Sequence, residues 1–118
     1  MVFVDALRGL TGTVVDLGSG GGLPGLVLAV ARPELHLVLL DARAVRCRFL
    51  EAAVQDLGLD AEVVEGRAEL AGRGPHRGTA DAVVARSFGA PATTAECGAP
   101  LLRPGGCLVV SEPPDPDP

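Results

Sequence analysis

The chain has 118 residues, of which 47% are hydrophobic and 3% aromatic, and its formal net charge is −5. This length and apolar content suit one domain with a buried core and exclude a wholly disordered chain. The sequence has no lysine, which excludes Schiff-base catalysis and a Walker-type phosphate loop. Three of its acids lie in the last seven residues, so the rest of the chain is nearly neutral and gives no general signal for binding a polyanion.

Short apolar segments alternate with helical patterns along the chain. In chain order we predict a helical lead at 2–10, a strand at 13–17, a glycine loop, a helix ending at 31, a strand at 35–40, a helix at 43–57, a strand at 61–64, a Gly/Arg loop at 71–79, a strand at 81–85, a helix at 91–102 and a strand at 107–111. The chain as a whole divides into a short lead at 1–12, a core at 13–111 and a Pro/Asp tail at 112–118. We expect the tail to be disordered. This alternation is typical of an α/β domain with a parallel sheet and right-handed crossovers.

The helix at 43–57 is predicted from apolar residues near helical spacing, among them Val45 and Phe49. Arg43 and Arg46 share a face at its start. That face is either solvated or in contact with RNA or a partner.

The most informative segment lies between the first strand and the helix that follows it. Glycines there let the backbone approach a ligand closely, because they lack a Cβ and accept positive φ. A GxGxxG match at Gly20, Gly22 and Gly25 is compatible with NAD, but an acid-x-Gly-x-Gly-x-Gly pattern beginning at Asp16 resembles the first motif of class I S-adenosylmethionine methyltransferases. We expect Asp16 to meet the ammonium group of that methyl donor. The loop residues predicted to bind the cofactor are Gly18, Ser19, Gly20 and Gly22.

Further candidate residues follow the ends of other strands, where ligands of open α/β sheets bind. Asp41 lies about 20 residues beyond the loop, where a carboxylate can accept both ribose hydroxyls of an adenosine; capping of the next helix is a compatible alternative. Ala68 and Glu69 follow the third strand, in a turn that lies beside the adenine in this architecture; Glu69 is alternatively a first-turn helix acid. Arg86 ends the fourth strand and faces the donor carboxylate, the substrate or solvent.

Five segments together resemble motifs of the GidB-like family, the guanine-N7 methyltransferases of small-subunit ribosomal RNA. These segments are 16–25, 40–41, 48–50, 67–69 and 85–88. The most distinctive is Leu23-Pro24-Gly25, directly after the glycine loop, and the resemblance extends over about residues 13–111.

The resemblance implies a Rossmann-like class I methyltransferase core with strand order 3-2-1-4-5, S-adenosylmethionine as cofactor, and methylation of a guanine N7 in 16S ribosomal RNA. It places donor contacts on Gly18, Leu23, Ala68, Glu69 and Arg86. The family has two strands after the fifth; we expect this core to lack them, which leaves an open sheet edge that favours oligomerisation. The implied partner is ribosomal RNA or a ribosomal subunit. No catalytic side chain is predicted, because the N7 lone pair is free at neutral pH and positioning can supply the catalysis.

Two alternatives stay open: an NAD-dependent oxidoreductase and a truncated or inactive nucleoside-binding module. No metal site is expected, because His36 and His76 have no accompanying ligand cluster. Three widely spaced cysteines indicate a reducing compartment, and there is neither a signal peptide nor an apolar run of about 20 residues, so we expect a soluble cytoplasmic protein without a membrane partner.

Overall fold

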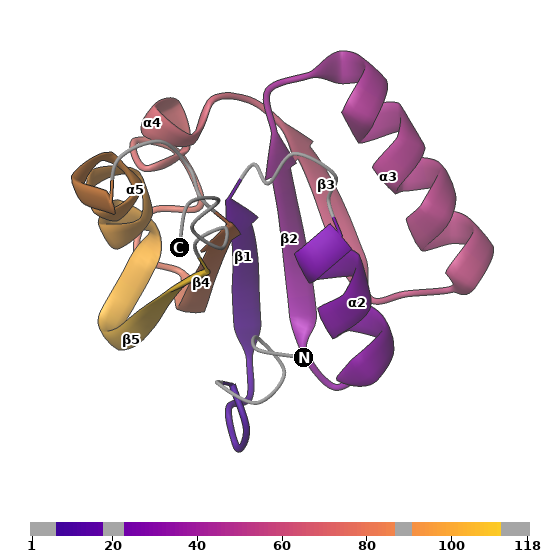
Figure 1. Cartoon of the computed structure of the whole chain (residues 1–118), viewed down its shortest axis with the longest axis horizontal. Helices are drawn as coiled ribbons and strands as arrows, with labels where there is room; N and C mark the ends of the chain where they lie inside the picture. Colours follow the sequence, from indigo (N-terminus) through magenta and orange to yellow (C-terminus); the bar gives the residue numbers. More distant parts are fainter. Residues whose placement is uncertain (1–6, 18–22, 87–90, 112–118) are drawn as a thin grey trace, which may run out of the picture.

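The computed structural model describes residues 7–17, 23–86 and 91–111 (Figure 1). Its centre is a parallel sheet of five strands in the order β3-β2-β1-β4-β5, which confirms the predicted order. The strands are β1 (Thr13–Leu17), β2 (His36–Asp41), β3 (Ala61–Glu65), β4 (Ala80–Arg86) and β5 (Leu102–Ser111). Because all of them run in one direction, their carboxyl ends share one edge of the sheet.

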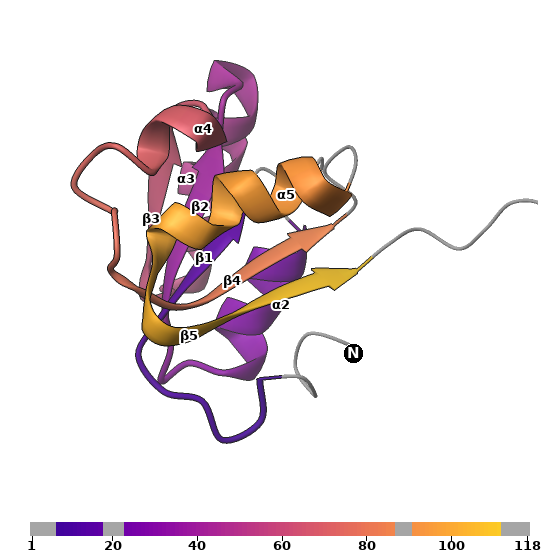
Figure 2. The same cartoon turned by 90° about the vertical axis from the view of Figure 1, so that its left-hand side faces the viewer.

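Helices cover both faces of this sheet (Figures 1 and 2). On one face lie α2 (Leu23–Ala31) and α3 (Ala44–Leu57), and on the other lie α4 (Ala68–Ala71) and α5 (Pro91–Gly98). The side changes after β3 because the chain then crosses to β4, beyond β1, so a right-handed crossover puts its helix on the opposite face.

Two apolar clusters form the core, one beneath each helical layer. Members of the cluster beneath α2 and α3 include Leu7, Val14, Leu28, Leu37, Leu39 and Leu50. Members of the other include Val15, Leu17, Val38, Val83, Cys97 and Leu101. Successive residues of β1 alternate between the two clusters, as the pleat of a strand requires.

The described part of the N-terminal lead packs against the first cluster. Leu7 is 1% exposed, and residues 7–9 form a turn; the earlier residues of the predicted helical lead lie outside the described residues. The guanidinium of Arg32, the residue directly after α2, donates hydrogen bonds to the carbonyl oxygens of Leu7 at 2.9 Å and Leu10 at 2.6 Å. This segment is therefore tied to the core by both apolar and polar contacts.

The helix predicted at 43–57 is present as α3, but it buries a different face from the one that carries the predicted apolar spacing. Val45 and Phe49 are 72% and 59% exposed, whereas Cys47 and Leu50 are buried. The sequence contains two overlapping apolar stripes at helical spacing, and the connections to β2 and β3 select the one that meets the sheet.

The helix predicted at 91–102 is shorter than expected. It ends at Gly98, continues as a 3₁₀ turn (Ala99–Leu101), and β5 begins at Leu102 rather than at 107. A Cβ at Gly98 would lie 3.0 Å from Leu108 Cδ1, so this end of α5 rests closely on β5. The early start of β5 is accommodated by a register shift against β4 between Ala80 and Ala82. The tail at 112–118 lies outside the described residues.

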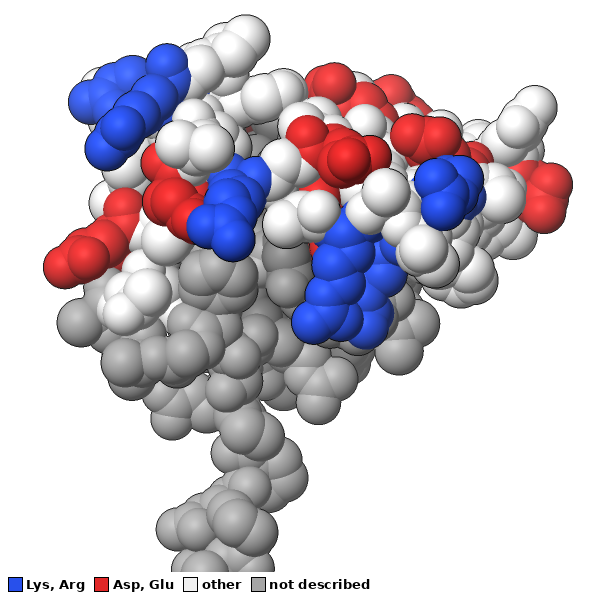
Figure 3. All heavy atoms as spheres, turned by 90° about the horizontal axis from the view of Figure 1, so that it is seen from above, with Lys and Arg blue, Asp and Glu red and all other residues white. Residues whose placement is uncertain are grey.

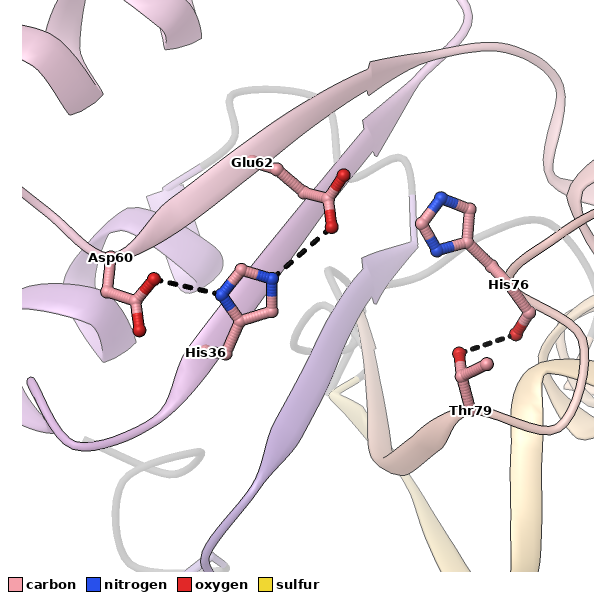
Figure 4. A network of polar contacts seen from close by, with 5 residues as sticks. All are labelled: His36, Asp60, Glu62, His76 and Thr79. Atoms are coloured by element: carbon pink, nitrogen blue, oxygen red, sulfur yellow. Dashed lines mark hydrogen bonds and ion pairs between the residues drawn. The ribbon is translucent and has the colours of Figure 1, made fainter.

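The amino edge of the sheet carries a polar cluster around His36, the first residue of β2 (Figure 4). Its Nδ1 lies 3.0 Å from Asp60 Oδ1 and its Nε2 lies 3.3 Å from Glu62 Oε1. Hydrogen bonding to Asp60, and more weakly to Glu62, raises the pKa of His36. His76 lies apart from this cluster, and its carbonyl oxygen accepts a hydrogen bond from the Thr79 hydroxyl at 2.7 Å.

Candidate functional site

The candidate residues of the sequence converge on the carboxyl edge of the sheet. Leu17 pairs with Leu40, so Asp41 lies one residue further along the strand next to β1. Adjacent strands are about 5 Å apart. Arg86 ends β4, on the other side of β1, although its side chain is not described. Gly18, Ser19, Gly20 and Gly22 connect this edge to α2 and lie outside the described residues.

Asp41 is the most clearly defined acid at this edge, and it is only 6% exposed. Its Oδ1 accepts a hydrogen bond from the Arg43 N–H at 2.8 Å, directly before α3. The carboxylate therefore organises the turn that leads into α3. It does not cap the helix as the alternative from sequence proposed, because α3 begins at Ala44 with Arg43 as its N-cap and no side-chain cap hydrogen bond. Because a carboxylate offers about four lone-pair positions, this bond is compatible with accepting the hydroxyls of a ribose.

The backbone of Asp41 is also held from two sides. Its carbonyl oxygen accepts hydrogen bonds from the Gly66 N–H at 2.9 Å and from the Cys47 thiol at 3.4 Å. Burial, reinforced by nearby carboxylates, raises the pKa of Cys47, so the thiol keeps its proton and can donate. Cys47 was not among the residues predicted from sequence, because its contribution depends on the phase at which α3 docks.

The turn after β3 presents backbone donors beside Asp41. Ala68 is 6% exposed and packs into the second cluster, so its side chain points inward. Glu69 is exposed, and its carboxylate lies 3.4 Å from Arg67. The N–H groups of Ala68 and Glu69 belong to the first turn of α4, where a helix supplies no internal acceptor. A Cβ at Gly66, two residues before Ala68, would meet no atom within 4 Å, so the space at this glycine is open.

Asp16, the penultimate residue of β1, is 2% exposed and lies on the face of the sheet that α2 covers. Its Oδ2 accepts a hydrogen bond from the Gly25 N–H at 3.0 Å. In the sequence, Gly25 belongs to a GxGxxG match and to Leu23-Pro24-Gly25, but neither pattern predicts this packing role. Leu23 is the first residue of α2; its side chain is not described.

Charged side chains of both signs are interspersed over the described surface at this edge (Figure 3). Arg43 is exposed and Arg46 is half-buried, so the two arginines at the start of α3 differ in accessibility. Among the described side chains this view shows no continuous basic surface. The arrangement of an acid, open space and backbone donors suits a neutral nucleoside better than a polyphosphate.

No group of three or more histidine, cysteine, aspartate or glutamate side chains within the described ranges could hold a metal ion. In the same part of the chain, no helix is long and apolar enough to cross a membrane.

A protein-family model described as rRNA small subunit methyltransferase G matches residues 1–112. The ribosomal RNA small subunit methyltransferase G of Mycobacterium leprae is 50% identical over 96 residues, which cover 81% of this chain and 39% of that protein. The protein of the same description from Salinispora arenicola is 49% identical over 105 residues, which cover 85% of this chain and 43% of that protein. The chain thus spans about two fifths of the length of these curated relatives.

Solved structures of methyltransferases share the fold. A protein of Methanococcus maripaludis, assigned as an S-adenosyl-L-methionine-dependent methyltransferase, superposes with a TM-score of 0.75 at 21% identity, covering 94% of this chain and 53% of its own. The aminoglycoside resistance methyltransferase NpmB1 superposes with a TM-score of 0.63 at 26% identity, covering 83% of this chain and 54% of its own. The α/β fold is therefore the Rossmann-like fold of these enzymes.

Proposed function

This chain belongs to the rRNA small subunit methyltransferase G family, and we propose that it forms the S-adenosylmethionine-binding core of an enzyme that methylates a guanine N7 of 16S ribosomal RNA. The observation that carries the proposal is the buried carboxylate of Asp41, at the carboxyl edge and next to the open space at Gly66. Family membership indicates the chemistry of this arrangement.

The described residues fit the adenosine half of the cofactor. Asp41 would accept the ribose hydroxyls, and the backbone N–H groups of Ala68 and Glu69 would face the adenine. Asp16 and Arg86 would lie on the methionine side. The remaining proposed contacts are those of the glycine loop and the start of α2, at Gly18, Ser19, Gly20, Gly22 and Leu23.

When bound, S-adenosylmethionine supplies an electrophilic methyl group. Guanine N7 carries its lone pair at neutral pH, so no proton has to leave before attack. The chain's own contribution is then to hold the two reactants in line, a kind of catalysis that needs no general base. Accordingly, we assign no catalytic side chain to the reaction.

Of the alternatives, an NAD-dependent oxidoreductase is not favoured, because the matching family model describes a methyltransferase. An inactive nucleoside-binding module would bind the same cofactor without transferring its methyl group. A methyl-transfer assay separates that alternative from the proposal.

The proposed partner is ribosomal RNA or the ribosomal subunit that contains it, and that substrate would place the reaction in the cytoplasm. We also propose self-association through β5. Within the described residues, β5 pairs with β4 on one side only, and Cys107 on it is exposed. An unpaired edge offers N–H and C=O groups to another strand. Sizing chromatography over a concentration series should then show larger species as concentration rises; a constant monomer volume would contradict this.

Calorimetry with S-adenosylhomocysteine and, separately, NAD tests the cofactor. We expect the intact chain to bind the adenosyl ligand and Asp41→Ala to weaken binding by about 1.5–3 kcal/mol, the scale of a hydrogen bond to a charged group. Asp56→Ala is the matched control, because Asp56 is an exposed acid at the far end of α3. Binding of NAD alone would overturn the assignment.

Methyl transfer is then measured with labelled S-adenosylmethionine on small ribosomal subunits, followed by nucleoside analysis. The proposed function predicts label in 7-methylguanosine. Cofactor binding without any transfer would support the inactive module instead.

A further inference from the structure

The buried carboxylate of Asp16 lies between β1 and the start of α2. The side chain is 2% exposed, and its Oδ2 is 3.0 Å from the backbone nitrogen of Gly25. Burying a carboxylate is costly unless hydrogen bonds and nearby positive potential compensate it. Gly25 is the third residue of α2, so its N–H donates the hydrogen bond, and the amino end of the helix dipole supplies the positive potential.

The sequence of α2 makes this donor important. The first turn of a helix contains N–H groups that lack an internal acceptor, and Pro24 contributes none because proline has no N–H. Gly25 therefore supplies one of the few amides available in this turn, and Asp16 accepts from it across nine residues of sequence.

The glycine at this position is required by packing. A Cβ on Gly25 would overlap the Leu39 side chain, lie 2.5 Å from Asp16 Oδ2 and lie 3.0 Å from Asp16 Cβ. Leu39 and Asp16 are register partners on β2 and β1, so the start of α2 rests directly on the central strand and its neighbour. Even an alanine would push the helix away and lengthen the hydrogen bond.

We propose that Asp16 and Gly25 are positioning residues for the cofactor-binding segment. Their contact holds the start of α2 against the end of β1 and so sets the separation between Leu17 and Leu23, the residues that bracket the glycine loop. On this proposal Asp16 acts through α2 rather than by touching the ligand, which differs from the direct ammonium contact expected from sequence. The inference rests on the proposed function for its effect on binding, but not for the contact itself.

Two measurements on the intact chain test it: hydrogen exchange at the Gly25 amide without ligand, and calorimetry with S-adenosylhomocysteine. Asp16→Leu removes the acceptor but keeps the volume, and we expect about tenfold faster exchange and at least tenfold weaker binding, since tenfold corresponds to about 1.4 kcal/mol and a charged hydrogen bond contributes at least that. Asp16→Asn keeps a carbonyl acceptor for Gly25 and should bind within about fivefold of the wild type. Gly25→Ala should resemble Asp16→Leu.

Two controls separate positioning from general destabilisation. Val14→Ala removes a fully buried side chain from the same face of β1 and should lower stability without changing either measurement. Gly74→Ala adds a Cβ whose nearest neighbour is 3.8 Å away, so it should be neutral.

If Asp16→Asn and Asp16→Leu weaken binding equally while Gly25 exchange is unchanged, Asp16 touches the ligand directly and the inference is wrong. If both bind as the wild type does, the contact has no positioning role. Should the wild-type chain itself not bind the adenosyl ligand, the proposed function fails, whereas the exchange measurement still decides whether the contact holds α2.

Discussion

Gly12, directly before β1, should tolerate no side chain, for two separable reasons. Its φ of +101° is unfavourable for any L residue with a Cβ, and a Cβ there would overlap Asp81 Oδ2 and lie 2.8 Å from Asp81 Cγ. Asp81, on β4, accepts hydrogen bonds from the Thr13 N–H at 2.8 Å and from the Arg103 guanidinium. Displacing this carboxylate would therefore loosen the amino ends of β1, β4 and β5 together.

Gly9 provides the comparison that isolates the second reason. Its φ is +83°, but a Cβ there would meet nothing within 4 Å, so Gly9→Ala carries only the backbone cost of about 1–2 kcal/mol. Gly12→Ala adds the loss of hydrogen bonds to Asp81, roughly 1.5–3 kcal/mol for a charged acceptor, and toward the lower figure because Arg103 is exposed. We expect Gly12→Ala to destabilise the fold by about 2.5–3.5 kcal/mol, the sum of the two contributions.

Urea unfolding followed by circular dichroism at neutral pH measures both variants. In an Asp81→Ala background, Gly12→Ala should cost little more than Gly9→Ala, because the displaced group is gone. Hydrogen bonding to Arg103, and then to Thr13, lowers the pKa of Asp81. The stabilisation by Asp81 is thus present above the ordinary carboxyl pKa and is lost as pH falls through the lowered one. Equal destabilisation by Gly9→Ala and Gly12→Ala at neutral pH would refute this reasoning.

Three further predictions concern the core, the amino edge and the thiols. Leu28→Ala should cost about 2–5 kcal/mol in urea unfolding, whereas Phe49→Ala should stay within about 0.5 kcal/mol because Phe49 is exposed on α3; a large loss for Phe49→Ala would contradict the observed face of α3. His36 has a raised pKa, so its stabilising contribution is fully present below pH 6.5 and is lost as pH rises through the raised pKa. The urea concentration at the unfolding midpoint should therefore decrease when the pH is raised from about 6 to about 9, and this decrease should be absent in His36→Gln. A thiol-disulfide reagent should modify exposed Cys107 first and Cys47 only when the fold opens, because burial blocks access and raises the pKa of Cys47; equal rates in the native protein would disprove this order.

The sheet was predictable because its signals are local. The apolar run at 13–17 is bounded by turn residues on both sides, and β1 spans those same residues. Gly58 follows the helical pattern of α3 and ends the helix in the left-handed conformation, with φ of +62°. Each of these signals depends on a few neighbouring residues and needs no knowledge of tertiary contacts.

Features that depend on packing could not be predicted in the same way. Val45 and Phe49 have the spacing of a buried stripe, yet the chain buries Cys47 and Leu50, since docking against the sheet selects between two stripes that sequence cannot rank. The start of β5 was placed five residues late for a similar reason. Proline and glycine at 104–106 are typical of a turn, but the register shift opposite β4 lets an edge strand include them.

The candidate site combines both kinds of information. Chain position was enough to bring Asp16 and Asp41 to the carboxyl edge, because every strand of a parallel sheet ends there. What sequence could not show is which backbone N–H group each carboxylate binds: Asp16 accepts from Gly25 in the first turn of α2, and Asp41 accepts from Arg43 directly before α3. An alanine at either position therefore removes a structural acceptor together with any ligand contact, and a loss of binding in such a variant does not by itself identify a ligand contact. Asparagine retains an acceptor for the backbone and removes the charge, so comparing asparagine with alanine at both positions separates shaping of the edge from recognition of the ligand.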